Sequence, residues 1–100
     1  MKKELQSKER AYLRKLASSY PAILQLGKDG ISPAITKACA EALLARELIK
    51  VACLPNCEAL PKEAAAIIAE RTGAEVVTVI GRKFVLFKSN PKLKDKAIKL

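Results

Sequence analysis

Two prolines, Pro33 and Pro61, each stand at the start of a helical pattern that follows a short apolar run. Proline is favoured at the first position of a helix, because the N–H that it lacks would have no partner there. The apolar runs before them, residues 23–26 and 48–54, have the length and bounding residues of strands. The sequence therefore contains strand–turn–helix units in succession, which predicts an α/β fold.

The first helix is expected over residues 3–20, and Pro21 ends it. Its apolar residues fall within one arc at helical spacing, so this arc is expected to face the core. Basic residues on the opposite side form a ridge that is expected to point away from the core. The arc consists of Leu5, Tyr12, Leu13, Leu16 and Tyr20, and the ridge consists of Lys3, Arg10 and Arg14.

Two further helices are expected at residues 33–46 and 61–72. Ser32 is the expected N-cap of the first of these, and Gly73 is the expected stop of the second. Each has one face that is expected to be buried. These faces consist of Ile35, Ala38, Cys39, Ala42 and Leu43 in the one, and of Ala64, Ile67 and Ile68 in the other.

The last two strands are expected at residues 75–80 and 83–88, joined by Gly81 and Arg82 in a type II′ hairpin. Right-handed crossovers would make the first three strands largely parallel. The predicted fold is a single-domain two-layer α/β sandwich with a mixed four-stranded sheet, in the order α-β-α-β-α-β-β. The domain is expected to span residues 1–90, followed by a basic C-terminal tail at residues 91–100, either a frayed helix or a disordered arm.

Nineteen Lys and Arg against ten Asp and Glu give a net charge of +9, which favours a polyanionic partner. Charge alone does not distinguish nucleic acid from an acidic membrane surface. No uncharged run approaches the roughly 20 residues that would span a bilayer, so no membrane span is expected. Three cysteines, an odd number without a preceding signal peptide, favour the cytoplasm.

The chain contains no histidine, which excludes Ser-His-Asp and Cys-His catalysis and the commonest metal-ligand sets. Cys53 and Cys57 are separated by three residues, and Cys39 is the third thiol, so a four-ligand zinc site is not expected. The acidic residues form no close pair within an apolar stretch. We therefore expect no enzyme, no cofactor and no small-molecule substrate.

The segment Gly27-Lys28-Asp29-Gly30, the glycine loop, lies between an expected strand and a capped helix. Two glycines allow successive backbone N–H groups to turn outward, and the helix start adds its positive dipole end. Lys28 would add a point charge. The four residues by themselves fit a plain tight turn equally well, whereas their position favours an anion site.

The glycine loop and its flanks together resemble the CRM domain (chloroplast RNA splicing and ribosome maturation), particularly its bacterial single-domain form, the YhbY-like RNA-binding proteins. The matching stretches occur in the family order over about residues 4 to 88. They are residues 7–17, 26–32, 47–51, 72–75 and 79–82.

The resemblance implies a fold similar to the C-terminal domain of translation initiation factor three, with a helix added in front. It also implies a KH-like glycine loop that binds RNA, and it assigns the loop to Gly27, Lys28 and Gly30. Asp29 departs from the family, which usually has a neutral or basic residue there, and residues 53–60 differ from an acidic insert often found after the second strand. The predicted RNA-binding residues are Gly27, Lys28, Asp29, Gly30, Arg10, Arg14, Lys50, Arg82 and Lys83.

Bacterial members of the family are associated with precursors of the large ribosomal subunit, and plant members with intron splicing. The resemblance therefore predicts a ribosome assembly factor that binds ribosomal RNA and is expected to be a monomer. The alternative from another class is an adaptor that docks its basic face on a ribosomal protein or another protein. Membrane-surface and DNA-binding roles are supported by net charge and have no motif of their own.

Overall fold

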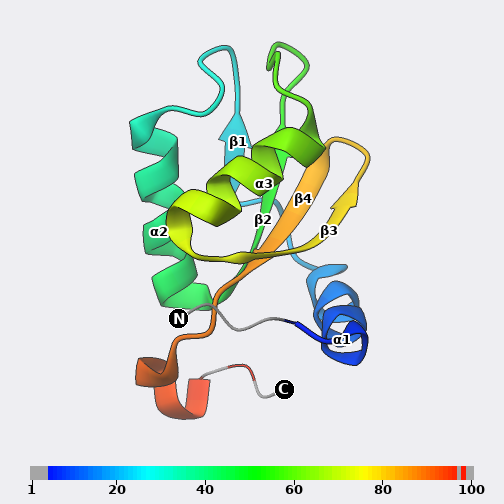
Figure 1. Cartoon of the computed structure of the whole chain (residues 1–100), viewed down its shortest axis with the longest axis vertical. Helices are drawn as coiled ribbons and strands as arrows, with labels where there is room; N and C mark the ends of the chain where they lie inside the picture. Colours follow the sequence, from blue (N-terminus) through cyan, green and yellow to red (C-terminus); the bar gives the residue numbers. More distant parts are fainter. Residues whose placement is uncertain (1–4, 97, 99–100) are drawn as a thin grey trace.

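The computed structural model describes residues 5–96 and residue 98. Three α-helices, four strands and a final 3₁₀ helix follow one another in the predicted order within this part of the chain (Figure 1). The elements are α1 (Ser7–Ala17), β1 (Leu24–Leu26), α2 (Pro33–Arg46), β2 (Leu48–Cys53), α3 (Pro61–Thr72), β3 (Glu75–Ile80), β4 (Lys83–Phe87) and the 3₁₀ helix η1 (Pro91–Lys96).

The helix ends follow from local chemistry in the sequence. Ser32 caps α2, because its Oγ accepts a hydrogen bond from the backbone N–H of Ile35 at 3.1 Å. Gly73 ends α3 in the left-handed conformation with φ 75°. Both caps are confirmed, whereas α1 is shorter than predicted and begins after a capping box between Gln6 and Glu9.

The four strands form one mixed sheet in the order β1-β2-β4-β3. β1 and β2 are parallel, and β4 is antiparallel to both of its neighbours, β2 and β3. The predicted hairpin is confirmed, since Gly81 has φ 58° and Arg82 keeps a negative φ, as a type II′ turn requires. β4 thus inserts between β2 and β3, and the three other strands run in the same direction.

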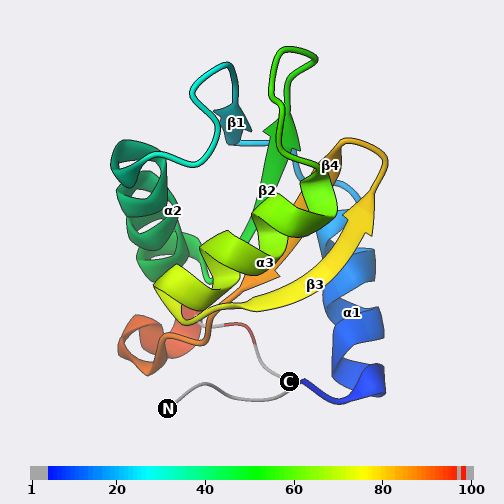
Figure 2. The same cartoon turned by 45° about the horizontal axis from the view of Figure 1, so that its top comes forward.

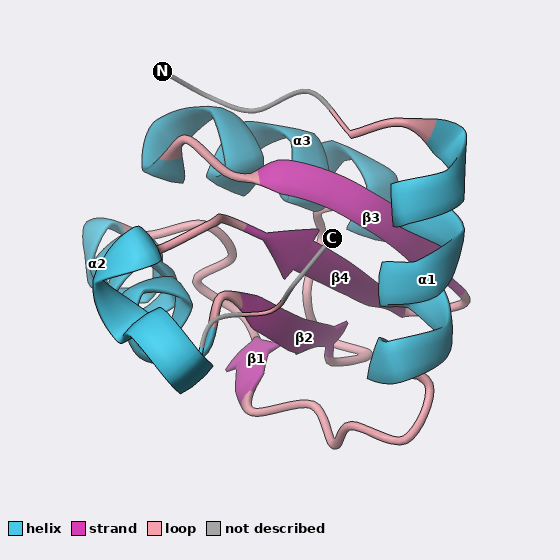
Figure 3. Cartoon of the chain, turned by 90° about the horizontal axis from the view of Figure 1, so that it is seen from below, coloured by secondary structure: helices cyan, strands magenta, loops and turns pink. Residues whose placement is uncertain are grey.

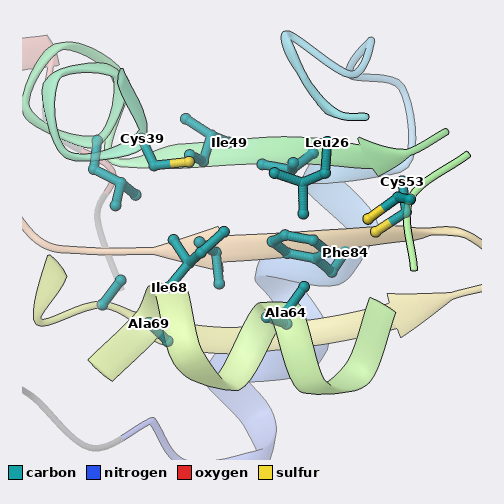
Figure 4. Packing of buried hydrophobic residues seen from close by; sticks show 14 residues of the cluster. Leu26, Cys39, Ile49, Cys53, Ala64, Ile68, Ala69 and Phe84 are labelled. Carbon is teal, nitrogen blue, oxygen red and sulfur yellow. The ribbon is translucent and has the colours of Figure 1, made fainter. Parts of the chain in front are cut away.

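Helices cover the two faces of this sheet unequally (Figure 3). α2 and α3 cover one face, and the core between them and the sheet contains Phe84 of β4 (Figure 4). α1 crosses the other face, where Leu13 and Ala17 pack with Val85. The predicted single domain with a mixed four-stranded sheet is therefore confirmed, and α1 adds a partial layer on the far face.

Two apolar residues that were expected in the core are exposed. Tyr12 keeps 49% of its surface accessible, and Ile67 keeps 39%. Successive residues of a helix are about 100° apart, so each of these lies about a quarter-turn from its buried neighbour, Leu13 or Ile68. The contact strips of α1 and α3 are narrower than the arcs that periodicity predicted.

The described part of the C-terminal stretch is attached to the domain through Glu47. This residue is fully buried and has a positive φ of 63°. Its carboxylate accepts hydrogen bonds from the backbone N–H groups of Asn90 and Ile98, both at 2.6 Å. Ile98 also packs against the cluster that contains Leu13 and Val85, so Asn90 and Ile98 both contact the domain. A separate tail stays a prediction.

Candidate functional site

The glycine loop lies where β1, β2 and β3 end, which we call the loop end of the sheet (Figures 1 and 2). The Gly30 N–H donates a hydrogen bond to the Gly27 carbonyl at 2.9 Å, so the loop is a tight turn with Lys28 and Asp29 at its exposed tip. Gly30 has φ 60°, a conformation that glycine adopts without steric cost. The chain then enters the capped N-terminus of α2.

An open cleft of about 300 Å³ lies between this loop and the first turn of α2. Backbone N–H groups at the start of a helix and its dipole favour an anion there. Lys28 adds a positive charge and Asp29 a negative one to the same wall. The cleft is lined by Gln25, Gly27, Lys28, Asp29, Gly30, Ser32, Ala34 and Ile35.

Two other segments reach the loop end. The β2–α3 loop (residues 54–60) approaches the glycine loop, because the Leu54 N–H donates a hydrogen bond to the Leu26 carbonyl at 2.8 Å. The hairpin turn between β3 and β4 approaches the β2–α3 loop, because the Arg82 guanidinium donates to the carbonyls of Cys53 and Leu54. Three segments far apart in sequence therefore lie together at the loop end, joined by these hydrogen bonds (Figure 2).

Lys50 and Lys83 project from the face of the sheet that α1 crosses. Lys50 lies opposite Val85 in the β2–β4 register, and Lys83 precedes Val85 by two residues. Because alternate residues of a strand share a face, both lysines point to the side where Val85 packs against α1. Lys83 is exposed beside the hairpin turn, and Lys50 is half-buried in the middle of the sheet.

Arg10 does not point away from the core as the sequence predicted. Its guanidinium Nη1 donates to the Val76 carbonyl and approaches the Val77 carbonyl at 3.5 Å. The β3–β4 register is irregular between Val76 and Thr78, and a bulge leaves backbone groups without a ladder partner. Arg10 therefore joins α1 to β3, whereas Arg14 is exposed and Lys3 lies outside the described residues. RNA contact by Arg10 or Arg14 stays a prediction.

The three thiols are buried. Burial raises the pKa of Cys39 from 9.0 to about 11. Burial also raises the pKa of Cys53, the neighbouring Cys57 raises it further, and Arg82 lowers it. The Cys39 and Cys53 thiols are therefore protonated at neutral pH, and all three cysteine side chains fill space in the core. Among the described residues, no cluster of His, Cys, Asp and Glu could hold a metal ion.

The model of the CRS1/YhbY (CRM) domain matches residues 5–88. This protein belongs to the CRS1/YhbY family. The chain is also 38% identical over 91 residues to the "Probable RNA-binding protein YqeI" of Bacillus subtilis. The matched residues cover 91% of this chain and 95% of the relative. The name of this relative describes RNA binding.

A solved structure is similar over almost the whole CRM domain. It is the solution structure of a hypothetical protein from Staphylococcus aureus, described as "a putative RNA binding protein". The TM-score is 0.78 at 38% sequence identity, over 92% of this chain and 96% of that chain. The CRM fold described above is therefore shared by a protein of known structure. No helix within the described residues is both long and apolar enough to cross a bilayer.

The sequence did not single out the β2–α3 loop as part of the site. Pro55 and Asn56 follow the strand expected at residues 48–54, and in the sequence they indicate only where that strand ends. The signal that could have found it is topological, because parallel strands place their carboxyl ends at one edge of a sheet, where ligands bind. The parallel pair β1 and β2 therefore brings residues 27–30 and 54–60 together.

The positive φ of Gly30 gives a stability prediction. Replacing Gly30 with Ala should lower the free energy of unfolding by about 1–2 kcal/mol, because an L side chain in this conformation is strained. No atom lies within 4 Å of the added Cβ, so the cost arises in the backbone. Urea denaturation measures the change.

Gly27→Ala is the matched control. Gly27 has no positive φ, and an added Cβ would meet its nearest atoms at 3.7 Å, an ordinary contact. Its free energy of unfolding should change by less than about 0.5 kcal/mol. An equal loss of unfolding free energy in Gly27→Ala and Gly30→Ala would contradict the assigned conformation of the loop.

Proposed function

We propose that this protein binds RNA through the loop end of the sheet, with phosphates held at the glycine loop. The observation that carries the proposal is the cleft between the glycine loop and the capped start of α2, with Lys28 on its wall. The dipole at the start of α2 and the charge of Lys28 suit a phosphate backbone. The names of the relatives support RNA as the polyanion.

Lys83 extends this surface on the other side of the hairpin turn. It is exposed at the start of β4, next to Arg82. A phosphate backbone that passes over the glycine loop and the β2–α3 loop would reach this lysine next. Asp29 is exposed at the tip of the glycine loop, and we propose that it turns aside from the phosphate.

The salt dependence of binding tests this surface. The logarithm of the association constant falls linearly with the logarithm of salt concentration, with a slope of roughly 0.7–0.9 per phosphate contact. Lys28→Gln and Lys83→Gln should each flatten the slope by about this amount, measured by fluorescence anisotropy with deproteinised structured RNA.

Arg71→Gln is the control, since Arg71 is exposed in the last turn of α3, at the opposite end of the sheet. It should leave the slope unchanged. Unchanged slopes in both lysine variants would contradict the assigned surface. Failure of the wild-type protein to bind deproteinised RNA at moderate salt would contradict RNA binding altogether and favour the protein-adaptor alternative.

We further propose that the bound RNA belongs to the precursor of the large ribosomal subunit, as the family resemblance implies. Crosslinking the protein to RNA in cells, followed by sequencing, tests this directly. The expected result is enrichment of large-subunit ribosomal RNA that the Lys28→Gln variant reduces. Enrichment of other transcripts instead would contradict the ribosomal assignment and leave RNA binding intact.

A further inference from the structure

The Arg82 side chain is hydrogen-bonded to two backbone carbonyls at the end of β2 and the start of the β2–α3 loop. Its Nε donates to the Cys53 carbonyl at 3.0 Å, and its Nη2 donates to the Leu54 carbonyl at 2.7 Å. The planar guanidinium spans two successive carbonyls in a way that a lysine ammonium does not reproduce. A guanidinium held by these two hydrogen bonds is less able to move toward a phosphate of bound RNA.

The carbonyls that Arg82 holds belong to the segment that contacts the glycine loop. The Leu54 N–H donates to the Leu26 carbonyl at 2.8 Å, immediately before Gly27. The Cys53 N–H in turn donates to the Arg82 carbonyl at 2.7 Å. One series of hydrogen bonds thus runs from the hairpin turn through the β2–α3 loop to the glycine loop.

Asn56 lies where this series brings the two loops together. A Cβ on Gly27 would be 3.7 Å from Asn56 Oδ1, so the amide lies directly beside the glycine loop. Asn56 is exposed, and its amide can both donate and accept hydrogen bonds. Base edges and ribose hydroxyls of RNA offer matching groups.

We infer that the β2–α3 loop is the second wall of the RNA site and that Asn56 hydrogen-bonds the nucleotide whose phosphate lies on the glycine loop. Arg82 is a positioning residue that holds this wall in place, and we call this role the brace. The inference rests on the proposed function. It assigns to Arg82 a different role from that of Lys83, the adjacent cation. The two roles separate experimentally, because a phosphate contact contributes to the salt slope and a brace does not.

The brace is tested first in the protein without RNA. Arg82→Lys keeps the charge and loses the two-carbonyl grip, so hydrogen exchange of the Leu54 amide should become roughly tenfold faster. Lys83→Gln, the matched control, should leave this rate unchanged. An unchanged Leu54 rate in Arg82→Lys would overturn the brace.

RNA binding then tests the wall. Arg82→Lys should weaken affinity about three- to tenfold, and Arg82→Gln should leave the salt slope unchanged. Asn56→Ala should also weaken affinity about three- to tenfold, with an unchanged Leu54 exchange rate. Wild-type affinity of Asn56→Ala would overturn the role of Asn56. Wild-type affinity of Arg82→Lys with a flattened slope in Arg82→Gln would make Arg82 a phosphate contact.

These results are distinguishable from a failure of the proposed function. If the wild-type protein binds no RNA, the proposed function and the role of Asn56 both fail. The exchange rate of Leu54 in the free protein still decides whether Arg82 holds the β2–α3 loop.

Discussion

The insertion of β4 between β2 and β3 determines both how the core packs and which segments meet at the loop end. It buries Phe84 against α3 and, one residue further, Val85 against α1, so a single strand serves both clusters. It also sets the hairpin turn beside the end of β2. Arg82 reaches the carbonyls there only because β4 begins at that point. The core and the loop end are therefore consequences of the same strand order.

Local signals in the sequence predicted much of this fold. Proline, serine and glycine at helix ends act on the adjacent turn of the backbone and need no tertiary contact. The helix ends at Ser32, Pro33 and Gly73 could therefore be predicted from the sequence. The hairpin turn at Gly81 is equally local. The burial of a side chain depends on distant parts of the chain. The apolar arc of a helix shows which residues can face a neighbouring element, but not how much of the arc that element covers. Tyr12 and Ile67 are exposed for this reason.

The candidate site was predictable in part. The glycine loop could be found, since its chemistry is contained in four consecutive residues. The roles of Arg10 and Arg82 could not, because each guanidinium is hydrogen-bonded to carbonyls that lie 28 to 67 residues away in the sequence. The buried carboxylate of Glu47 likewise depends on N–H groups 43 and 51 residues further along. A basic residue in a sequence thus indicates charge, and its partners decide whether that charge is available to RNA.

RNA is proposed to lie across the loop end of the sheet. Titration of the protein with a structured RNA fragment, followed through the amide chemical shifts by NMR, locates the bound RNA on the protein. We expect the largest shifts in the glycine loop, in the β2–α3 loop around Asn56 and at Arg82 and Lys83. Largest shifts on the outer faces of α2 and α3, with both loops unaffected, would contradict it.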